Sequence, residues 1–229
     1  MATENQSENN IYRNEEPNGS TRFVSSRIKP KTQKEITEWR KRELVFATLL
    51  CVAEKGIHQT TVEEITSRAN VSRGLIRHHF KNKQDLMVQA CKYLCDDFRM
   101  HIDKNVKTND DPWKALDHLV TTTFETPYFN DVSLAAWFSF WIASRNDDDL
   151  KLVYKEYYEW YRGYIHKLFE RADKLGQLHT DLDQTIDAFV SMTDGLWLEL
   201  SIDVTKYSPE YAASVCREFF KAFSQRMPK

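Results

Sequence analysis

Residues Thr61–Phe80, TVEEITSRANVSRGLIRHHF, predict two short helices joined by a tight turn. Thr61 is a suitable N-cap for the first helix, and Glu64, three residues later, completes a capping box. Asn70 stands at the turn, where an asparagine tolerates the left-handed backbone conformation. This arrangement is typical of a helix-turn-helix motif, whose second helix enters the major groove of DNA.

The second helix of this motif has an apolar face and a polar face. Leu75, Ile76 and Phe80 occupy the inward positions. The outward positions follow the predicted N-cap, Ser72, and are Arg73, Gly74, Arg77, His78 and His79. Arginine and histidine donate hydrogen bonds to base edges and phosphates, and a glycine lets the backbone approach DNA closely. The alternative interpretation is a helical hairpin whose basic face is only solvated.

The span from Trp39 to Leu86 resembles the DNA-binding domain of the TetR family of transcriptional regulators. The matching segments are ATLLCVAEKG, TVEEITSRANVS, GLIRHHF and KQDL. Two positions depart from the family pattern, because Asn70 stands where glycine is usual and His79 stands where tyrosine is usual. Histidine can replace tyrosine as a hydrogen-bond donor to phosphate, and its contact would be sensitive to pH near neutrality.

The resemblance implies an all-α fold, with an N-terminal DNA-binding domain and a C-terminal domain for ligand binding and dimerisation. It also implies that Lys83 anchors a DNA phosphate. We expect Arg73, Arg77 and His78 to lie near bases, and His79 near a phosphate. The full set of candidate DNA-contacting residues is Thr61, Ser72, Arg73, Gly74, Arg77, His78, His79 and Lys83.

Composition fits this interpretation. The 229 residues contain only six glycines and six prolines, which favours helices over a β-rich fold. The net charge of -2 does not by itself indicate a nucleic-acid partner, but seven Lys or Arg residues stand between Arg27 and Arg42 against two acidic ones. The four cysteines have no metal-ligand spacing, and no signal peptide or transmembrane run is present. We therefore expect a cytoplasmic protein without metal or membrane partner.

Four regions follow from these patterns. The polar residues 1–26 predict a disordered N-terminal extension, and residues 27–36 predict an extended basic arm that follows a DNA groove or merely aids solubility. The helix-turn-helix domain is expected over residues 37–84, with the motif itself at 61–80. Residues 85–229 form the predicted ligand-binding and dimerisation domain.

Periodicity and capping residues predict the helices of this chain. Outside the motif they are expected at about 37–55, 83–106, from 112, from 131 or 133, 150–175, from 181 or 183, and from 209. The last two are apolar over wide faces, and a second copy of the chain is the simplest cover. The family resemblance implies a homodimer in which these helices pack as a four-helix bundle. Two recognition helices about 34 Å apart, or a multiple of that, would then read an inverted repeat.

The C-terminal region is unusually rich in aromatic residues. Trp137 and Trp141 are four residues apart and share a helix face, and tyrosines crowd the segment 154–164. Several rings around one cavity, with a carboxylate from Asp194 or Asp117 beside them, would bind a quaternary ammonium group. The alternative is that these rings only pack the core.

Segments SLAAWFSFWIASR, residues 133–145, and DGLWLEL, residues 194–200, resemble the ligand domain of the choline-responsive BetI repressors of the TetR family. The resemblance implies a repressor of choline-uptake and glycine-betaine synthesis genes, involved in osmoregulation, with choline or a related trimethylammonium compound as effector. The candidate ligand-binding residues are Trp137, Trp141, Tyr158, Trp160, Asp194 and Trp197. The N-terminal extension and the tyrosine-rich segment depart from the family pattern.

Two other interpretations remain open on the sequence. A TetR-type regulator of efflux or lipid metabolism would sense an uncharged hydrophobic ligand with the same architecture. A helical small-molecule carrier or an enzyme is the third. The sequence shows no metal constellation, phosphate loop or nucleophile elbow, and it predicts a protein without catalytic residues or a cofactor.

Overall fold

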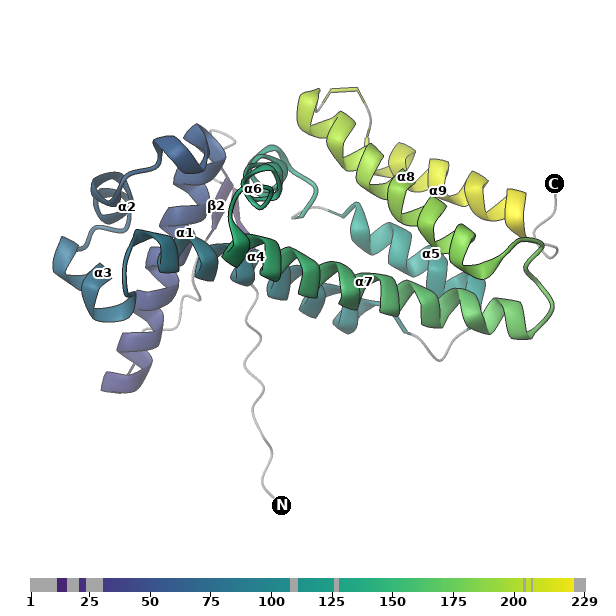
Figure 1. Ribbon diagram of the computed structural model, residues 1–229, viewed down its shortest axis with the longest axis horizontal. Helices are drawn as coiled ribbons and strands as arrows, with labels where there is room; N and C mark the ends of the chain where they lie inside the picture. Colours follow the sequence, from purple (N-terminus) through teal and green to yellow (C-terminus); the bar gives the residue numbers. More distant parts are fainter. Residues whose placement is uncertain are drawn as a thin grey trace, which may run out of the picture. The chain divides into compact units, whose positions relative to one another are not determined.

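The computed structural model describes residues 12–15, 21–23, 31–107, 111–125, 128–203, 205–206 and 208–224. Within these residues it contains nine helices and one two-stranded sheet, so the predicted all-α class is confirmed (Figure 1). The chain divides into two compact units, one up to Ala90 and one from Cys91 onward. No helix of the described part is long and apolar enough to cross a membrane.

The N-terminal extension contains two strands that the sequence interpretation did not foresee. Strands β1, Tyr12–Glu15, and β2, Thr21–Phe23, pair in an antiparallel manner. The polarity of residues 1–26 predicts disorder, but tyrosine, threonine and phenylalanine favour strands, and the described residues 12–15 and 21–23 pair as strands. The rest of that extension, and residues 27–30 of the expected basic arm, lie outside the described residues.

The first unit contains α1, Gln33–Gln59, α2, Val62–Arg68, α3, Arg73–His79, and the start of α4, Lys83–Asn105. Helix α1 begins earlier than the expected residue 37, so the end of the expected extended arm is helical. The reason is a capping box, in which the Thr32 hydroxyl accepts from the Glu35 N–H and the Glu35 carboxylate accepts from the Thr32 N–H. Gly56, where the helix was expected to end, has a positive φ of 76° and marks a kink.

The core of the first unit fixes the pair α2 and α3 against α1. Helix α1 buries one apolar face, on which Leu44, Leu49 and Val52 have no exposed surface. Ile65 of α2 and Ile76 of α3 are buried as well, and α2 packs against both α1 and α3. Burial of one face leaves the opposite face of α3 open to a partner.

The second unit contains the remainder of α4 and five further helices. These are α5, Pro112–Thr123, α6, Asp131–Ala143, α7, Asp148–Lys174, α8, Leu182–Ile202, and α9, Pro209–Phe223. Helix α6 starts at Asp131, one of the two expected first residues, and Asn130 caps it. Asp147, Asp181 and Ser208 cap α7, α8 and α9.

Helices α7 and α8 organise the second unit. Helix α7 packs against α5, α6 and α8, while α8 also packs against α6 and α9, as Figure 1 shows for α8 and α9. Fully buried phenylalanines fill the space between them, among them Phe169, Phe189 and Phe220. The last two helices carry some exposed apolar side chains, among them Ile202 of α8 and Tyr211 of α9, which are 79 % and 52 % exposed.

Candidate functional site

The turn between α2 and α3 has the geometry that the sequence predicts. The capping box of Thr61 and Glu64 is present, with both reciprocal hydrogen bonds. Asn70 has a positive φ of 52°, so the predicted left-handed conformation is confirmed. The Val71 N–H donates to the Thr66 carbonyl at 3.0 Å and closes the turn. These bonds set the direction in which α3 leaves α2.

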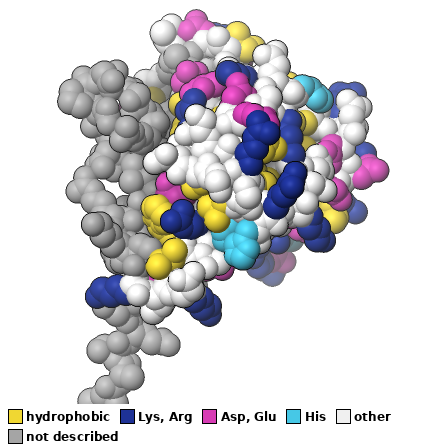
Figure 2. Space-filling view, turned by 90° about the vertical axis from the view of Figure 1, so that its left-hand side faces the viewer, with side chains coloured by type: hydrophobic (Ala, Val, Ile, Leu, Met, Phe, Trp, Pro, Cys, Tyr) yellow, Lys and Arg dark blue, Asp and Glu magenta, His cyan; other side chains and the backbone are white. Residues whose placement is uncertain are grey.

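Helix α3 presents a basic face to solvent. Arg73, Gly74, Arg77 and His78 are exposed, while Ile76 and Phe80 are buried. Figure 2 views the side of the molecule on which α3 lies, and lysine and arginine side chains gather there beside a histidine. A row of exposed donors with fixed charge is the arrangement that contacts bases and phosphates.

The other candidate residues lie at the edges of this face. Thr61 and Ser72 are exposed, and Lys83 is half-buried at the first residue of α4. Ser72 occupies the N-cap of α3 without a side-chain capping bond, so its hydroxyl is not engaged by its own helix. A Cβ on Gly74 would meet only the Ser72 Oγ at 3.8 Å, so packing inside the unit does not require glycine there.

Neighbouring side chains affect the charges of two residues of α3, Arg73 and His79. Arg73 forms an ion pair with Glu63 of α2, which holds its guanidinium at the start of α3. His79 is half-buried, and burial, followed by repulsion from His78 and Lys41, lowers its pKa. The lowered pKa favours the neutral imidazole of His79 near pH 7.

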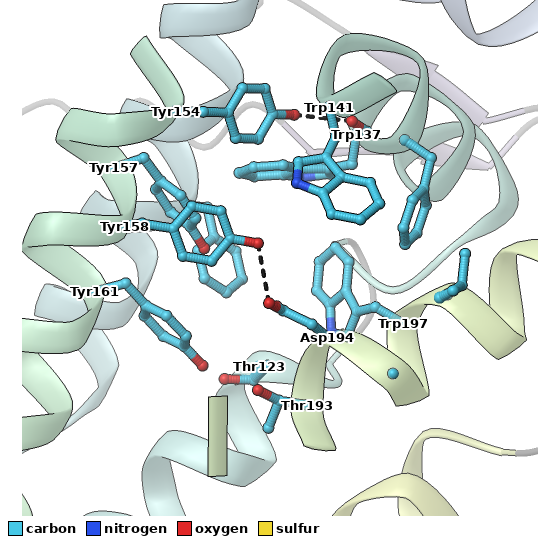
Figure 3. A pocket seen from close by; sticks show the side chains of 14 residues that line it. Thr123, Trp137, Trp141, Tyr154, Tyr157, Tyr158, Tyr161, Thr193, Asp194 and Trp197 are labelled. Carbon is cyan, nitrogen blue, oxygen red and sulfur yellow. Dashed lines mark hydrogen bonds between the residues drawn. The ribbon is translucent and has the colours of Figure 1, made fainter. Parts of the chain in front are cut away.

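A pocket lies in the second unit, among α4, α5, α6, α7 and α8 (Figure 3). Its volume is about 160 Å³, which is enough for a small organic molecule. The lining residues are mostly aromatic: Phe98, Thr123, Trp137, Phe138, Trp141, Tyr154, Tyr157, Tyr158, Tyr161, Thr193, Asp194, Gly195, Trp197 and Leu198.

The aromatic rings form walls that meet at steep angles. The Trp137 and Trp197 rings lie 6.0 Å apart and are nearly perpendicular, and the Tyr157 ring lies 5.2 Å from that of Trp137. Phe98 of α4 contacts both tryptophans edge-on. The Tyr154 hydroxyl donates to the Trp137 carbonyl at 2.8 Å and so ties α7 to α6. Ring faces held in this way surround one space on several sides.

Asp194 of α8 places a carboxylate in this pocket. The Tyr158 hydroxyl donates to its Oδ2 at 3.0 Å, as the dashed line in Figure 3 marks. Asp194 is partly open to solvent, yet burial of its carboxyl group raises its pKa to about 6, opposed by the Tyr158 hydrogen bond and by Arg162. The carboxylate is ionised at neutral pH and lacks full hydration, so it favours a cation beside it.

The structure brings together five of the six residues predicted for the ligand site. Trp137, Trp141, Tyr158, Asp194 and Trp197 all line the pocket, although Trp141 is also 44 % exposed. Trp160 lies elsewhere, in a surface hollow where the Arg99 guanidinium stacks on its ring at 5.4 Å. One residue step around α7 rotates the side chain by about 100°, which separates Trp160 from the faces of Tyr158 and Tyr161. Asp117, the other carboxylate considered, instead pairs with Arg217 at 2.5 Å.

Sequence reasoning missed several of the lining residues. Tyr154, Tyr157 and Tyr161 repeat at helical spacing, and this period identifies the pocket face of α7. Phe98 and Thr123 come from α4 and α5, and no local pattern in the sequence distinguishes them from other core residues. Only the packing of distant helices places them here.

Comparison with known proteins gives consistent matches over both units. Residues 44–90 match the family described as "Bacterial regulatory proteins, tetR family", and residues 112–224 match "BetI-type transcriptional repressor, C-terminal". The HTH-type transcriptional regulator BetI of Serratia proteamaculans (strain 568) is 26 % identical over 186 residues, which cover 79 % of this chain and 90 % of that protein. The BetI regulator of Pectobacterium carotovorum subsp. carotovorum (strain PC1) is 23 % identical, covering 80 % and 92 %.

Solved structures show the same fold. A protein from Pseudomonas aeruginosa PAO1 described as a transcriptional regulator is 25 % identical, with a TM-score of 0.70 over 86 % of this chain and 92 % of that one. Another, from Saccharomonospora viridis, was solved in complex with choline. It is 19 % identical, with a TM-score of 0.74 over 81 % of this chain and 98 % of that one. The proteins matched here are transcriptional regulators and not enzymes.

Proposed function

Because the chain belongs to the TetR family of transcriptional regulators and carries a BetI-type C-terminal domain, we propose that it is a repressor whose affinity for DNA responds to choline or a related quaternary ammonium compound. The observation that carries the proposal is the pairing of the Asp194 carboxylate with an aromatic pocket. Each part alone occurs in ordinary cores. Together they match the chemistry of a trimethylammonium group.

The charge balance of the pocket favours a cation. Asp194 is its one charged lining residue in the part of the chain that the structure describes, and no Lys or Arg lines it. The faces of Trp137, Tyr157 and Trp197 carry negative quadrupole potential, worth about 0.5–2 kcal/mol for each cation contact. A trimethylammonium group cannot donate a hydrogen bond, so ring faces and a nearby carboxylate are the partners suited to it.

The relatives support the same ligand class. The regulator from Saccharomonospora viridis was solved with choline, and the curated relatives are named BetI. By resemblance to BetI repressors, we propose that the target genes serve choline uptake and glycine-betaine synthesis. The apolar lining also fits an uncharged hydrophobe, as in a regulator of lipid metabolism or efflux, and the experiments below separate these ligands by charge.

On DNA we propose a homodimer that reads an inverted repeat. TetR regulators bind DNA and act as dimers. In this arrangement Arg73, Arg77 and His78 of α3 contact base edges, while His79 and Lys83 contact phosphates. The base contacts set sequence preference, whereas the phosphate contacts set register and the dependence on salt.

Helix α4 offers a physical link between ligand and DNA. It begins at Lys83 and carries Phe98 to the pocket, without a break in the helix. A ligand shifts the population of two conformations only through its different affinities for them. A cation that packs against Phe98 therefore favours the conformations in which α4 allows that contact.

Tryptophan fluorescence tests the proposed effector. Trp137, Trp141 and Trp197 line the pocket, so an occupying ligand changes their emission. We expect saturable quenching by choline and a much weaker response to 3,3-dimethyl-1-butanol, in which carbon replaces the cationic nitrogen. Equal responses to the two compounds, or no response to choline, would contradict a cationic effector and favour an uncharged hydrophobic ligand.

Choline affinity is expected to depend on pH through Asp194. Burial raises the pKa of this carboxyl group to about 6, so it is ionised above pH 7 and mostly protonated at pH 5. Protonation removes the negative charge that attracts the cation, and affinity should fall by about tenfold between pH 7.5 and pH 5. Isothermal titration at several pH values measures this, and Asp194→Asn is the control, since its affinity should stay flat over the same range.

A further inference from the structure

The pocket has a second polar end, formed by three hydroxyl groups. We infer that Thr123, Tyr161 and Thr193 bind the hydroxyl group of the effector, so that the pocket selects an ammonium alcohol over an ammonium carboxylate. The inference rests on the proposed function, because it assumes that a quaternary ammonium group occupies the aromatic part. It adds the chemistry of the other end of the ligand.

The three hydroxyls come from three helices and meet at one place. Thr123 belongs to α5, Tyr161 to α7 and Thr193 to α8, and each is only 3 % exposed. Figure 3 shows their oxygen atoms directed toward one another, below Asp194 in that view. The Tyr161 hydroxyl interacts with both threonines, while burial and the nearby Asp194 raise its pKa and keep it protonated.

The hydrogens of the two threonines are already committed. The Thr123 hydroxyl donates to the Leu119 carbonyl at 2.8 Å. The Thr193 hydroxyl has the carbonyls of Val190 and Phe189 at 2.9 and 3.1 Å, and its single hydrogen is directed to them. A hydroxyl carries one hydrogen and two lone pairs, so both threonine oxygens are left as acceptors.

Two of the other tyrosines that line the pocket have hydroxyl groups that are already engaged. The Tyr158 hydroxyl donates to Asp194 and the Tyr154 hydroxyl donates to the Trp137 carbonyl. The indole N–H groups of Trp137 and Trp197 are buried and have no hydrogen-bond partner among the described residues, and they belong to the aromatic part of the pocket, not to the hydroxyl cluster. The cluster thus offers several lone pairs and one adjustable hydrogen, that of Tyr161.

This balance suits an alcohol and disfavours a carboxylate. An alcohol donates its hydrogen to a threonine oxygen and accepts from Tyr161, which satisfies both sides. A carboxylate only accepts, so it would face the threonine lone pairs, and its charge would be repelled by Asp194 in the same pocket. Buried acceptors without a donor are costly, so the preference should be measurable.

Three ligands with the same cationic group separate these contributions in the full chain. Choline carries the alcohol, ethyltrimethylammonium lacks it, and glycine betaine carries a carboxylate. By isothermal titration we expect choline to bind about fivefold more tightly than ethyltrimethylammonium, and glycine betaine to bind more than about tenfold more weakly than choline. Equal affinities for choline and ethyltrimethylammonium, or tighter binding of glycine betaine, would overturn the hydroxyl site.

Two variants test whether the threonines of the cluster cause the preference for choline over ethyltrimethylammonium. The double variant Thr123→Val and Thr193→Val keeps side-chain shape and removes both acceptors, so the ratio of choline to ethyltrimethylammonium affinity should fall toward one. Thr48→Val is the matched control, because the Thr48 hydroxyl makes the same kind of bond to the Leu44 carbonyl in the buried core of the first unit. The ratio should be unchanged in this control.

The outcomes distinguish failure of the hydroxyl site from failure of the proposed cationic effector. A fivefold preference for choline that persists in the double variant would overturn the hydroxyl site and leave the cation pocket intact. Failure of all three ammonium compounds to bind the wild-type chain would overturn the proposed effector as well. The wild-type ligand series needs no variant, so the test holds even if the double variant folds poorly.

Discussion

Arg77→Ala is expected to abolish most of the sequence-specific affinity for DNA. Arg77 is exposed on α3, and burial of Ile76 and Phe80 on the other face of the helix directs it outward. Loss of one arginine that reads a base edge costs about 1–3 kcal/mol. A dimer loses this contact twice, so affinity should fall by roughly 30-fold to 10⁴-fold.

Fluorescence anisotropy with a duplex selected from a random pool by the wild-type protein measures this loss. Arg145→Ala is the matched control, since Arg145 is also an exposed arginine but belongs to the second unit. Choline affinity should be the same in the Arg77 variant and in wild type. If the Arg77 variant bound the duplex as tightly as wild type, Arg77 would not contact the operator.

Asp194→Asn is expected to weaken choline binding by roughly 10-fold to 100-fold. The substitution removes the charge and keeps the shape, and the amide oxygen can still accept from the Tyr158 hydroxyl. Partial exposure of Asp194 screens the charge, which sets the loss below that of a fully buried ion pair. The tryptophan and tyrosine walls remain, so an uncharged ligand should bind the variant as it binds wild type.

Titration with choline and with 3,3-dimethyl-1-butanol separates the charge from the shape of the pocket. The control variant is Asp183→Asn, an exposed aspartate in the first turn of the same helix. It should bind choline normally. Equal losses for choline and for the neutral alcohol in the Asp194 variant would mean that the substitution damages the pocket and does not remove a counter-charge.

The features that the sequence predicts well depend on neighbouring residues. The capping box at Thr61, the left-handed Asn70 and the buried face of α3 all follow from positions within a few residues of one another. The capping box of Thr32 and Glu35 is a local signal of the same kind, and it starts α1 at Gln33, before the predicted residue 37.

The ligand pocket was predictable in part. Some of its residues lie in aromatic segments that the sequence makes evident, whereas others line it only because of the orientation of α7. Trp137, Trp141 and Trp197 lie in segments with a recognisable aromatic pattern, and Asp194 adjoins the last of these. The rotation of α7 about its axis turns Tyr161 toward the pocket and Trp160 away from it. The aromatic composition of the segment alone does not predict this rotation.

The remaining residues of the pocket depend on packing between distant helices. Phe98 and Thr123 reach it from α4 and α5, more than 50 residues in sequence from Asp194. Their residue types are common in cores, and a threonine bonded to its own helix has no special sequence mark. The hydroxyl cluster therefore becomes visible only when α5, α7 and α8 are assembled.

The most direct test of the account is the effect of choline on the protein–DNA complex. We would titrate choline into wild-type protein bound to its selected duplex and follow anisotropy, at a constant ionic strength set with sodium chloride. We expect weaker DNA binding, with half of the effect at the choline concentration that half-saturates tryptophan quenching, and a choline requirement roughly 10-fold to 100-fold higher in Asp194→Asn. An unchanged DNA affinity at saturating choline would contradict it.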